Sequence, residues 1–210
     1  MDITLRYIDY LAKAGYVVFK PDYRGHGKSQ GQPQSSLEAG YTVDALNALS
    51  AIKKMPQASL EKIYIWGHSM GGRITLAMLL INPSVKAAVI WAVSLAPVLV
   101  QIKRWNTRGN PRRKQYLDVV KELGDPDKNS LKYQAFSAVD LAQDLQVPLQ
   151  IHHCEGDERL PVQDAKDFYK NMKKNGKNVQ LCLYQGGDHN FSGKELGLAM
   201  KKSIAFFRMW

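Results

Sequence analysis

Short hydrophobic runs alternate with longer amphipathic segments along most of the chain. The short runs are rich in β-branched and aromatic residues, which is typical of buried strands. The expected strands span residues 16–19, 62–66, 87–93, 149–153 and 179–184. Between them, apolar residues recur every three or four positions, which predicts helices. The expected helices span residues 3–14, 37–54, 69–80, 162–174 and 195–209.

Strands that alternate with helices predict an α/β fold, in which a mostly parallel sheet is covered by helices on both faces. Residues 97–147 break this rhythm with a basic run and several Gly and Pro residues. We therefore expect a cap-like insertion with short helices at about 98–135. The chain has 210 residues, 45% of them hydrophobic, which is enough for one core. We expect a single catalytic domain over residues 1–210.

The composition excludes several classes of protein. Charged residues make up 23% and aromatic residues 10%, which excludes a disordered chain. The longest apolar stretch, residues 87–100, contains Ser94 and Pro97 and is shorter than the roughly 18 residues of a membrane span. No signal peptide is visible at the N-terminus, which favours a cytoplasmic protein without a membrane partner. Cys154 and Cys182 form no CxxC pair and are expected to be buried thiols.

The formal net charge of +10 is concentrated in one segment. Six of the 29 Lys and Arg residues lie between residues 101 and 117, and this segment contains no Asp or Glu. A nucleic-acid surface, with Trp105 and Tyr116 as stacking partners, is one interpretation. A solvated loop is the simpler interpretation, so we expect no nucleic-acid partner.

The strongest chemical signal is Gly67-His68-Ser69-Met70-Gly71-Gly72, which follows an expected strand and opens an expected helix. This is the setting of the GxSxG turn, in which small residues allow a tight corner that exposes the serine hydroxyl. The helix that follows directs its positive end toward a developing oxyanion, and the Met70 N–H is one expected donor. A purely structural glycine-rich turn is the alternative. The setting favours Ser69 as a nucleophile.

A serine nucleophile needs a base and an acid that orients the base. His189 follows the last strand in a loop that two glycines precede, and it gives the chain order Ser, Asp, His that is expected of this architecture. Asp157 follows the strand at 149–153, and active sites of such sheets gather at the carboxyl ends of strands. Three other carboxylates nearby are less well placed to be the acid: Glu155, Asp164 and Asp188. The four other histidines are less well placed to be the base: His26, His68, His152 and His153.

The sequence gives no sign of a bound cofactor or metal. The loop at 22–29 lacks the GxxxxGK[ST] pattern of a phosphate-binding loop. His152 and His153 are neighbours on a strand, so their side chains are expected to point to opposite faces. No group of His and Cys residues has the spacing of a metal site. We therefore expect neither a cofactor nor a metal.

Five segments resemble the α/β-hydrolase fold and, within it, the catalytic domain of prolyl-oligopeptidase-type serine peptidases, including acylaminoacyl- and dipeptidyl-peptidases. They are LAKAGYVV (11–18), DYRGHGKS (22–29), GHSMGG (67–72), GDERLPV (156–162) and GDHNF (187–191). The resemblance covers nearly the whole chain outside the insertion. It implies Ser69 as nucleophile, His189 as base and Asp157 as orienting acid. Small esterases of this fold share all five segments.

The chain departs from the family's pattern at its start. The family has three earlier strands and a loop, often beginning His-Gly, that donates a second oxyanion N–H. The resemblance therefore implies an N-terminally truncated chain with an open slot between the strands at 16–20 and 62–66. The second oxyanion donor has no visible source. Unpaired strand edges and exposed apolar surface favour association between chains, so a homo-oligomer is expected.

The leading hypothesis is a serine hydrolase that cleaves a small peptide or ester substrate through an acyl-Ser69 intermediate. The resemblance favours a peptidase. A small-molecule carboxylesterase is the first alternative, and an inactive truncated fragment or a non-catalytic binding module is the second. Four arginines of the insertion are predicted to line the entrance and favour anionic substrates, although a solvated loop explains them equally well: Arg104, Arg108, Arg112 and Arg113.

Overall fold

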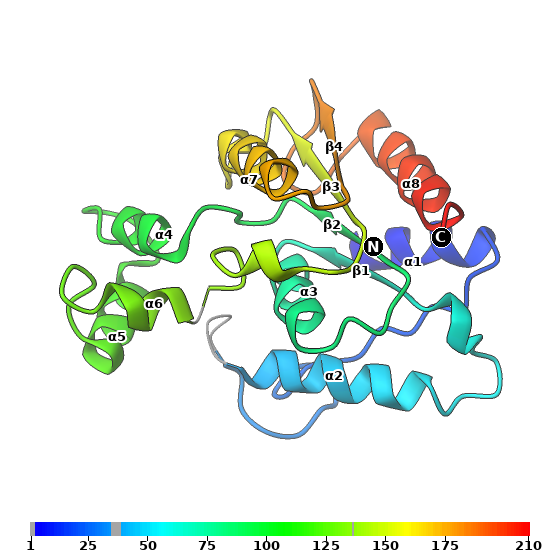
Figure 1. The fold of residues 1–210 in the computed structure, drawn as a ribbon, viewed down its shortest axis with the longest axis horizontal. Coiled ribbons are helices and arrows are strands. Elements are labelled where there is room, and N and C mark those ends of the chain that lie inside the picture. The colour runs from blue at the N-terminus through cyan, green and yellow to red at the C-terminus, as the bar shows by residue number, and fades with distance from the viewer. Residues whose placement is uncertain (1–2, 35–38, 136) are drawn as a thin grey trace.

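The computed structural model describes residues 3–34, 39–135 and 137–210 of the chain. A parallel four-stranded sheet runs through its centre (Figure 1). The strands lie side by side in chain order: β1 (Tyr64–His68), β2 (Ala87–Trp91), β3 (Leu149–Cys154) and β4 (Val179–Tyr184). Since all four run in the same direction, their carboxyl ends and the loops that follow meet at one edge.

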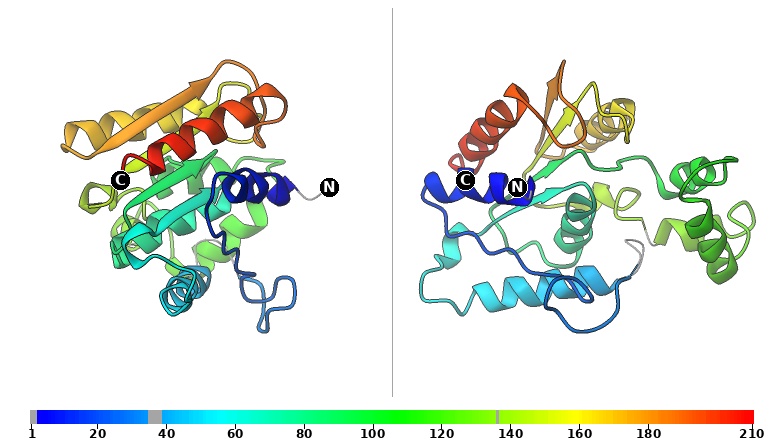
Figure 2. Two further views of the ribbon diagram at one scale, coloured as in Figure 1. Left: turned by 90° about the vertical axis from the view of Figure 1, so that its right-hand side faces the viewer. Right: turned by 180° about the vertical axis from the view of Figure 1, so that it is seen from behind.

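Helices cover both faces of the sheet (Figures 1 and 2). One face packs against α1 (Ile3–Lys13) and α8 (Lys194–Phe207). The other packs against α2 (Gly40–Ile52), α3 (Met70–Ile81) and α7 (Val162–Lys174). This arrangement confirms the predicted α/β class. No helix in the described ranges is both long enough and apolar enough to cross a bilayer.

Strand β2 contributes side chains to both hydrophobic cores, one on each face of the sheet. All five of its side chains are buried. Alternate residues face opposite sides of a strand. Val89 and Trp91 accordingly pack in the core with α1 and α8, whereas Ala88 and Ile90 pack in the core with α2, α3 and α7. The continuous apolar run is therefore explained by burial on both faces.

Most predicted element boundaries lie close to those observed. The helix at 162–174 and the strand at 179–184 begin and end where the sequence predicts. Strand β1 begins two residues later than predicted, because the 3₁₀ turn η1 (Leu60–Lys62) precedes it. In the predicted helix at 37–54, Leu37 and Glu38 lie outside the described residues, as does the side chain of Ile3 at the start of the chain.

The insertion forms a small helical group that extends away from the sheet (Figures 1 and 2). Its helices are α4 (Val98–Trp105), α5 (Arg113–Leu123) and α6 (Ser130–Ala135). They pack around their own apolar cluster of Val98, Ile102, Trp105 and Tyr133. The 3₁₀ turn η2 (Ala142–Asp144) then leads back to β3. Short helices are thus present where the sequence predicts them.

Both cysteines are free thiols. Cys154 is fully buried at the end of β3, and burial raises the pKa of its thiol to about 12. Cys182 is partly buried on β4, and burial raises its pKa as well. Thiols held in the protonated form are weak nucleophiles, so neither is prepared for chemistry.

The predicted strand at 16–19 is wrong. Residues 16–19 belong to no strand of the described sheet, and β1 forms one of its two edges. A cavity of about 940 Å³ lies between this segment and β1, and its lining includes Val17, Phe19, Tyr64 and Trp66. Direct pairing of the two segments, one way to close the slot, therefore does not occur. The hydrophobic run alone predicted a strand, but a strand also needs a partner.

Around the cavity, one buried polar group lacks a hydrogen-bond partner and two apolar side chains are exposed. The Nε1 of Trp66 is buried and has no hydrogen-bond partner among the described residues. Val17 and Phe19 are 63% and 43% exposed. Unpaired backbone groups along an edge strand also favour pairing with another chain. The free edge of β1, beside this cavity, is therefore one place where association between chains is favourable.

We predict that a polypeptide of residues 1–210 binds the dye ANS and elutes partly as oligomers in size-exclusion chromatography with light scattering. The double substitution Val17→Lys and Phe19→Lys should lower both signals, because it places charge at the cavity while leaving the sheet intact. Far-UV circular dichroism checks that the variant keeps its fold. A wild-type monomer without ANS binding would contradict this prediction.

Candidate active site

Ser69 lies at the corner between β1 and α3. Its backbone has φ 52° and ψ −116°, a region that residues with a side chain rarely adopt. The Ser69 N–H donates to the carbonyl of Trp91 on β2, at 2.8 Å. A side chain at Gly67 would collide with the backbone of Gly71, and one at Gly72 would collide with Val93. Gly67 and Gly72 are therefore required by the close packing around the turn that presents Ser69, whereas a side chain at Gly71 would meet no atom within 4 Å.

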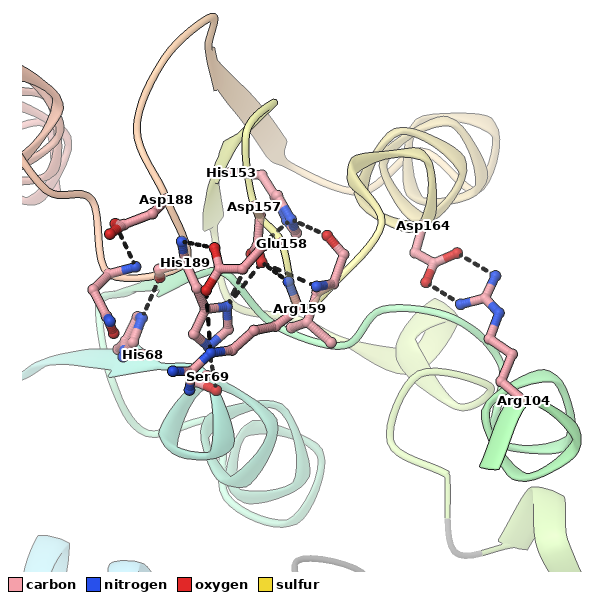
Figure 3. A network of polar contacts seen from close by, with 12 residues as sticks. His68, Ser69, Arg104, His153, Asp157, Glu158, Arg159, Asp164, Asp188 and His189 are labelled. Atoms are coloured by element: carbon pink, nitrogen blue, oxygen red, sulfur yellow. Dashed lines mark hydrogen bonds and ion pairs between the residues drawn. The ribbon is translucent and has the colours of Figure 1, made fainter. Parts of the chain in front are cut away.

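Ser69, His189 and Asp157 are brought together by the loops after β1, β4 and β3 (Figure 3). The Nε2 of His189 lies 2.9 Å from the Oγ of Ser69. Its Nδ1 lies 2.9 Å and 3.1 Å from the two carboxylate oxygens of Asp157. When Nδ1–H donates to Asp157, the lone pair of Nε2 is free to accept the Ser69 hydroxyl proton.

The carboxylate of Asp157 is almost completely buried and is surrounded by donors. The backbone N–H groups of Arg159 and Leu160 donate to it at 2.9 Å and 3.0 Å, and the Nε2 of His153 lies 3.2 Å away. Burial by itself raises the pKa of Asp157, but hydrogen bonds from His153, His189 and these backbone groups outweigh burial and hold the pKa well below its usual value. Asp157 therefore carries a fixed negative charge beside His189.

His153 supports Asp157 from a second direction, a role that the sequence analysis missed. Its fully buried ring places Nε2 3.2 Å from the carbonyl of Leu160 as well as 3.2 Å from Asp157. Its Nδ1 is buried without a partner among the described residues. Since Nε2 faces two oxygen acceptors, its N–H can donate to Asp157. The sequence signal that could have indicated this role is the position of His153 near a strand end, four residues before Asp157.

His152 faces the opposite side of β3, as predicted for neighbouring strand residues. Its Nδ1 lies 2.8 Å from the hydroxyl of Tyr184, and its Nε2 lies 2.7 Å from the Oε1 of Gln150. Burial lowers the pKa of His152 to about 3, with a smaller contribution from the charge of Lys202. His152 is therefore a neutral residue of the core beside α8 and not part of the Ser69 site.

The loop that carries His189 is fixed by contacts outside the imidazole ring (Figure 3). The Nε2 of His68 lies 2.8 Å from the carbonyl of His189, and Glu158 accepts the His189 N–H at 3.2 Å. Burial lowers the pKa of His68, so the neutral form with Nε2–H donating is favoured. His68, inside the GxSxG turn, thus joins the serine corner directly to the histidine loop.

The competing acids have other partners. The carboxylate of Asp188 accepts the N–H groups of Asn190 and Ser192 and the hydroxyl of Ser192, so it shapes the loop. Asp164 forms two hydrogen bonds with Arg104, and Glu155 pairs with Lys166. Asp157 is therefore the carboxylate that contacts the His189 ring. The last histidine, His26, bonds to the hydroxyl of Tyr41 instead.

The four arginines of the insertion lie in different environments. Arg104 is held by Asp164 of α7, at 2.5 Å and 2.9 Å. Arg112 lies over the ring of Trp105, with 5.8 Å between the guanidinium carbon and the ring centroid. Arg108 and Arg113 are exposed. In the ranges that the structure covers, no three His, Cys, Asp or Glu side chains group as a metal site requires.

Stability should depend on His152 in a way that a pH series can measure. Its pKa is lower in the folded protein than in the unfolded chain, where it is about 6.5. Its contribution is therefore complete above pH 6.5 and is lost as the pH falls toward 3. We expect the free energy of unfolding to fall by about 2 kcal/mol from this residue between pH 7 and pH 5. Urea titrations at both pH values check this.

His152→Gln should remove that part of the pH dependence, because glutamine does not titrate. The expected variant is less stable than wild type at pH 7, and the gap between the two proteins narrows at pH 5. An equal loss for both proteins between pH 7 and pH 5 would show that His152 is not the group responsible.

Comparison with known proteins adds a family match to this geometry. Residues 4–210 match the prolyl oligopeptidase family. The chain is 26% identical over 185 residues to an uncharacterized peptidase, YtmA, of Bacillus subtilis, covering 88% of this chain and 68% of the relative. It is 29% identical over 195 residues to the lysophosphatidylserine lipase ABHD12 of Danio rerio, covering 86% of this chain and 48% of the relative.

Solved structures show the same α/β-hydrolase fold. Acylaminoacyl peptidase of Pyrococcus horikoshii superimposes with a TM-score of 0.65 and 24% identity, over 80% of this chain and 27% of its own. Est1E of Butyrivibrio proteoclasticus, solved with ferulic acid bound, superimposes with a TM-score of 0.74 and 20% identity, over 100% of this chain and 83% of its own. The chain thus spans about a quarter of the length of the first structure. With the family match over residues 4–210, we conclude that the chain belongs to the prolyl oligopeptidase family of serine hydrolases.

Proposed function

We propose that this chain hydrolyses a carboxylic ester or amide through an acyl-Ser69 intermediate. The observation that carries the proposal is the continuous hydrogen-bonded series from Ser69 Oγ through His189 to Asp157. A serine hydroxyl is a weak nucleophile unless an adjacent base removes its proton. The short distances and the burial of the His189 and Asp157 side chains meet this requirement.

The proposed reaction has two halves that mirror each other. In the first, the Ser69 proton moves to Nε2 of His189 while Oγ bonds to the substrate carbonyl carbon. The tetrahedral species then collapses, and His189 returns the proton to the leaving alcohol or amine. In the second half, His189 takes a proton from water, hydroxide adds to the acyl carbon, and Ser69 recovers its proton as the acid departs. Asp157 stays ionised throughout and stabilises the charged imidazole.

The oxyanion of the tetrahedral species needs donors close to Ser69. Helix α3 begins at Met70, so the Met70 N–H has no acceptor within the helix and is free to donate. The positive end of the helix adds a favourable field. We assign Met70 as one donor and infer that a second comes from outside the GxSxG turn. Loss of one oxyanion donor typically costs about 100- to 1,000-fold in turnover.

Two substrate classes follow from different observations. The family match, and the relatives described as peptidases, favour a peptide bond. The superposition on Est1E over the whole chain favours an ester, because that structure was solved with ferulic acid bound. A site with one assigned oxyanion donor also favours esters, whose alcohol leaves more readily than an amine. We retain the peptidase as the first candidate and the carboxylesterase as the second.

The proposal is tested by covalent labelling with a fluorophosphonate probe, which reacts with an activated serine. We expect labelling of the wild-type chain, no labelling of Ser69→Ala, and labelling slowed by about 10⁴-fold in His189→Ala and Asp157→Ala. The double variant His189→Ala/Asp157→Ala should be no slower than the slower single variant, because the residues act as a unit. Asp188→Ala, which removes a carboxylate that shapes the His189 loop without contacting the imidazole ring, should slow labelling less than Asp157→Ala.

Two outcomes would contradict the proposal. Labelling that persists in Ser69→Ala would place the reactive group elsewhere, and a wild-type chain that is folded but unreactive would support a non-catalytic role. Rates on 4-nitrophenyl esters and on peptide 4-nitroanilides then separate the two substrate classes. A variant Asp157→Ala close to wild type, beside an inactive Asp188→Ala, would exchange the roles of these two carboxylates.

His153 should act on turnover through Asp157. We predict that His153→Leu lowers kcat by about tenfold with KM within twofold, because Asp157 loses a donor while the substrate site is unchanged. His153→Gln, which keeps an N–H donor, should recover part of the loss. The matched control His152→Gln, on the opposite face of β3, should lower stability without this change in kcat. Equal kcat values for His153→Leu and wild type would exclude a positioning role.

A further inference from the structure

Arg73 is a half-buried cation one helical turn beyond Ser69. It lies in α3, and its N–H donates to the Ser69 carbonyl at 3.3 Å. Side chains on a helix lean toward its N-terminus, so the Arg73 side chain leans toward the Ser69 end of α3. Its guanidinium donates to the Oε1 of Gln101 at 3.3 Å, a long and neutral contact. Arg73 is thus placed beside the candidate site and is not neutralised by that contact.

Helix α4 brings a second arginine to the same place. Gln101 is buried and fixed by a hydrogen bond from its Nε2 to the carbonyl of Ala96. Trp105 lies one turn further along α4, on the same helix face, and its ring lies under the exposed side chain of Arg112. Arg73 and Arg112 therefore approach one face of α4, through Gln101 and Trp105.

The two guanidinium groups share a region that lacks a carboxylate. Among the described residues, neither Arg73 nor Arg112 forms an ion pair. Burial and, to a smaller extent, the positive charge of Arg112 lower the pKa of Arg73 to about 10. Nearby cations of the insertion are neutralised, Lys103 by Asp127 and Arg104 by Asp164. Arg108 and Arg113 also form no ion pair among the described residues, but both are exposed, whereas Arg73 is half-buried and feels the charge of Arg112.

Two like charges close together, one of them desolvated, destabilise each other until an anion lies between them. A guanidinium presents paired N–H donors that match a carboxylate, so a carboxylate is the anion that fits. We propose that Arg73 and Arg112 form an anion subsite that binds a carboxylate group of the substrate while its scissile carbonyl lies at Ser69. This rests on the proposed hydrolase function, which it deepens by assigning a substrate class. Four residues of helix separate Arg73 from Ser69, a rise of about 6 Å, which places the carboxylate a few bonds from the scissile carbonyl.

The test compares two esters of similar length, 4-nitrophenyl hydrogen glutarate, which ends in a carboxylate, and 4-nitrophenyl valerate, which does not. We expect wild type to prefer the glutarate ester in kcat/KM. Arg73→Gln and Arg112→Gln should each lower this preference by about tenfold or more, with the valerate ester within about threefold of wild type. Arg108→Gln, an exposed arginine of the same segment, is the matched control and should leave the preference unchanged. An unchanged preference in both Arg73→Gln and Arg112→Gln would overturn the subsite.

A binding measurement separates failure of the subsite from failure of the proposed function. If neither ester is turned over and the fluorophosphonate probe does not label Ser69, the hydrolase proposal fails, and the subsite is then decided by thermal unfolding with added glutarate. Glutarate should raise the Tm of the wild-type chain and Arg108→Gln but not of Arg112→Gln, whose exposed side chain is not needed for folding. Sodium chloride at equal ionic strength controls for general salt effects. Equal rises in Tm for all three proteins would overturn the subsite.

Discussion

A buried negative charge organises the carboxyl edge of this sheet. The Asp157 carboxylate is 1% exposed, and a charge taken out of water is tolerated only where donors surround it. Its donors come from its own loop, from the end of β3 and from the loop after β4. The serine corner joins the same assembly through His68 and the His189 ring. The geometry of Ser69 is therefore inseparable from the hydrogen bonding of a residue that Ser69 does not contact.

Local sequence signals predicted the centre of this assembly because parallel strands deliver their ends to one edge. Ser69 follows β1 directly, and Asp157 and His189 lie in the loops after β3 and β4, so a correct prediction of these three strands was enough to place the residues at one edge. The same reasoning failed for residues 16–19. Their apolar character is real, since Tyr16 and Val18 pack against the core, but strand pairing depends on a neighbour that the run itself does not specify.

Other features depend on tertiary contacts that no motif encodes. In the sequence, His153 is one of two adjacent strand histidines. Its role depends on the contact between its Nε2 and Asp157, which only the structure shows. Arg73 is unremarkable in the sequence, because the absence of a carboxylate around it becomes visible only when α4 and the loop before α5 are packed against it. The structure likewise shows which basic residues of the insertion are paired with acids and which are not. Arg104 joins α4 to α7, while Arg112 remains uncompensated.

Among the described strands, β1 has a neighbour on one side only, and this strand carries the corner at Ser69. Its inner edge is held by β2, through the ladder and the bond from Ser69 to Trp91. On its outer edge, beside the cavity, no described strand accepts hydrogen bonds from the amide groups of β1, so these groups are open to exchange with solvent. Local opening starts where backbone hydrogen bonds are fewest. The rigidity of β1, the strand that holds Ser69, consequently depends on whether its outer edge is paired. A strand that paired with this edge would reduce the motion of Ser69.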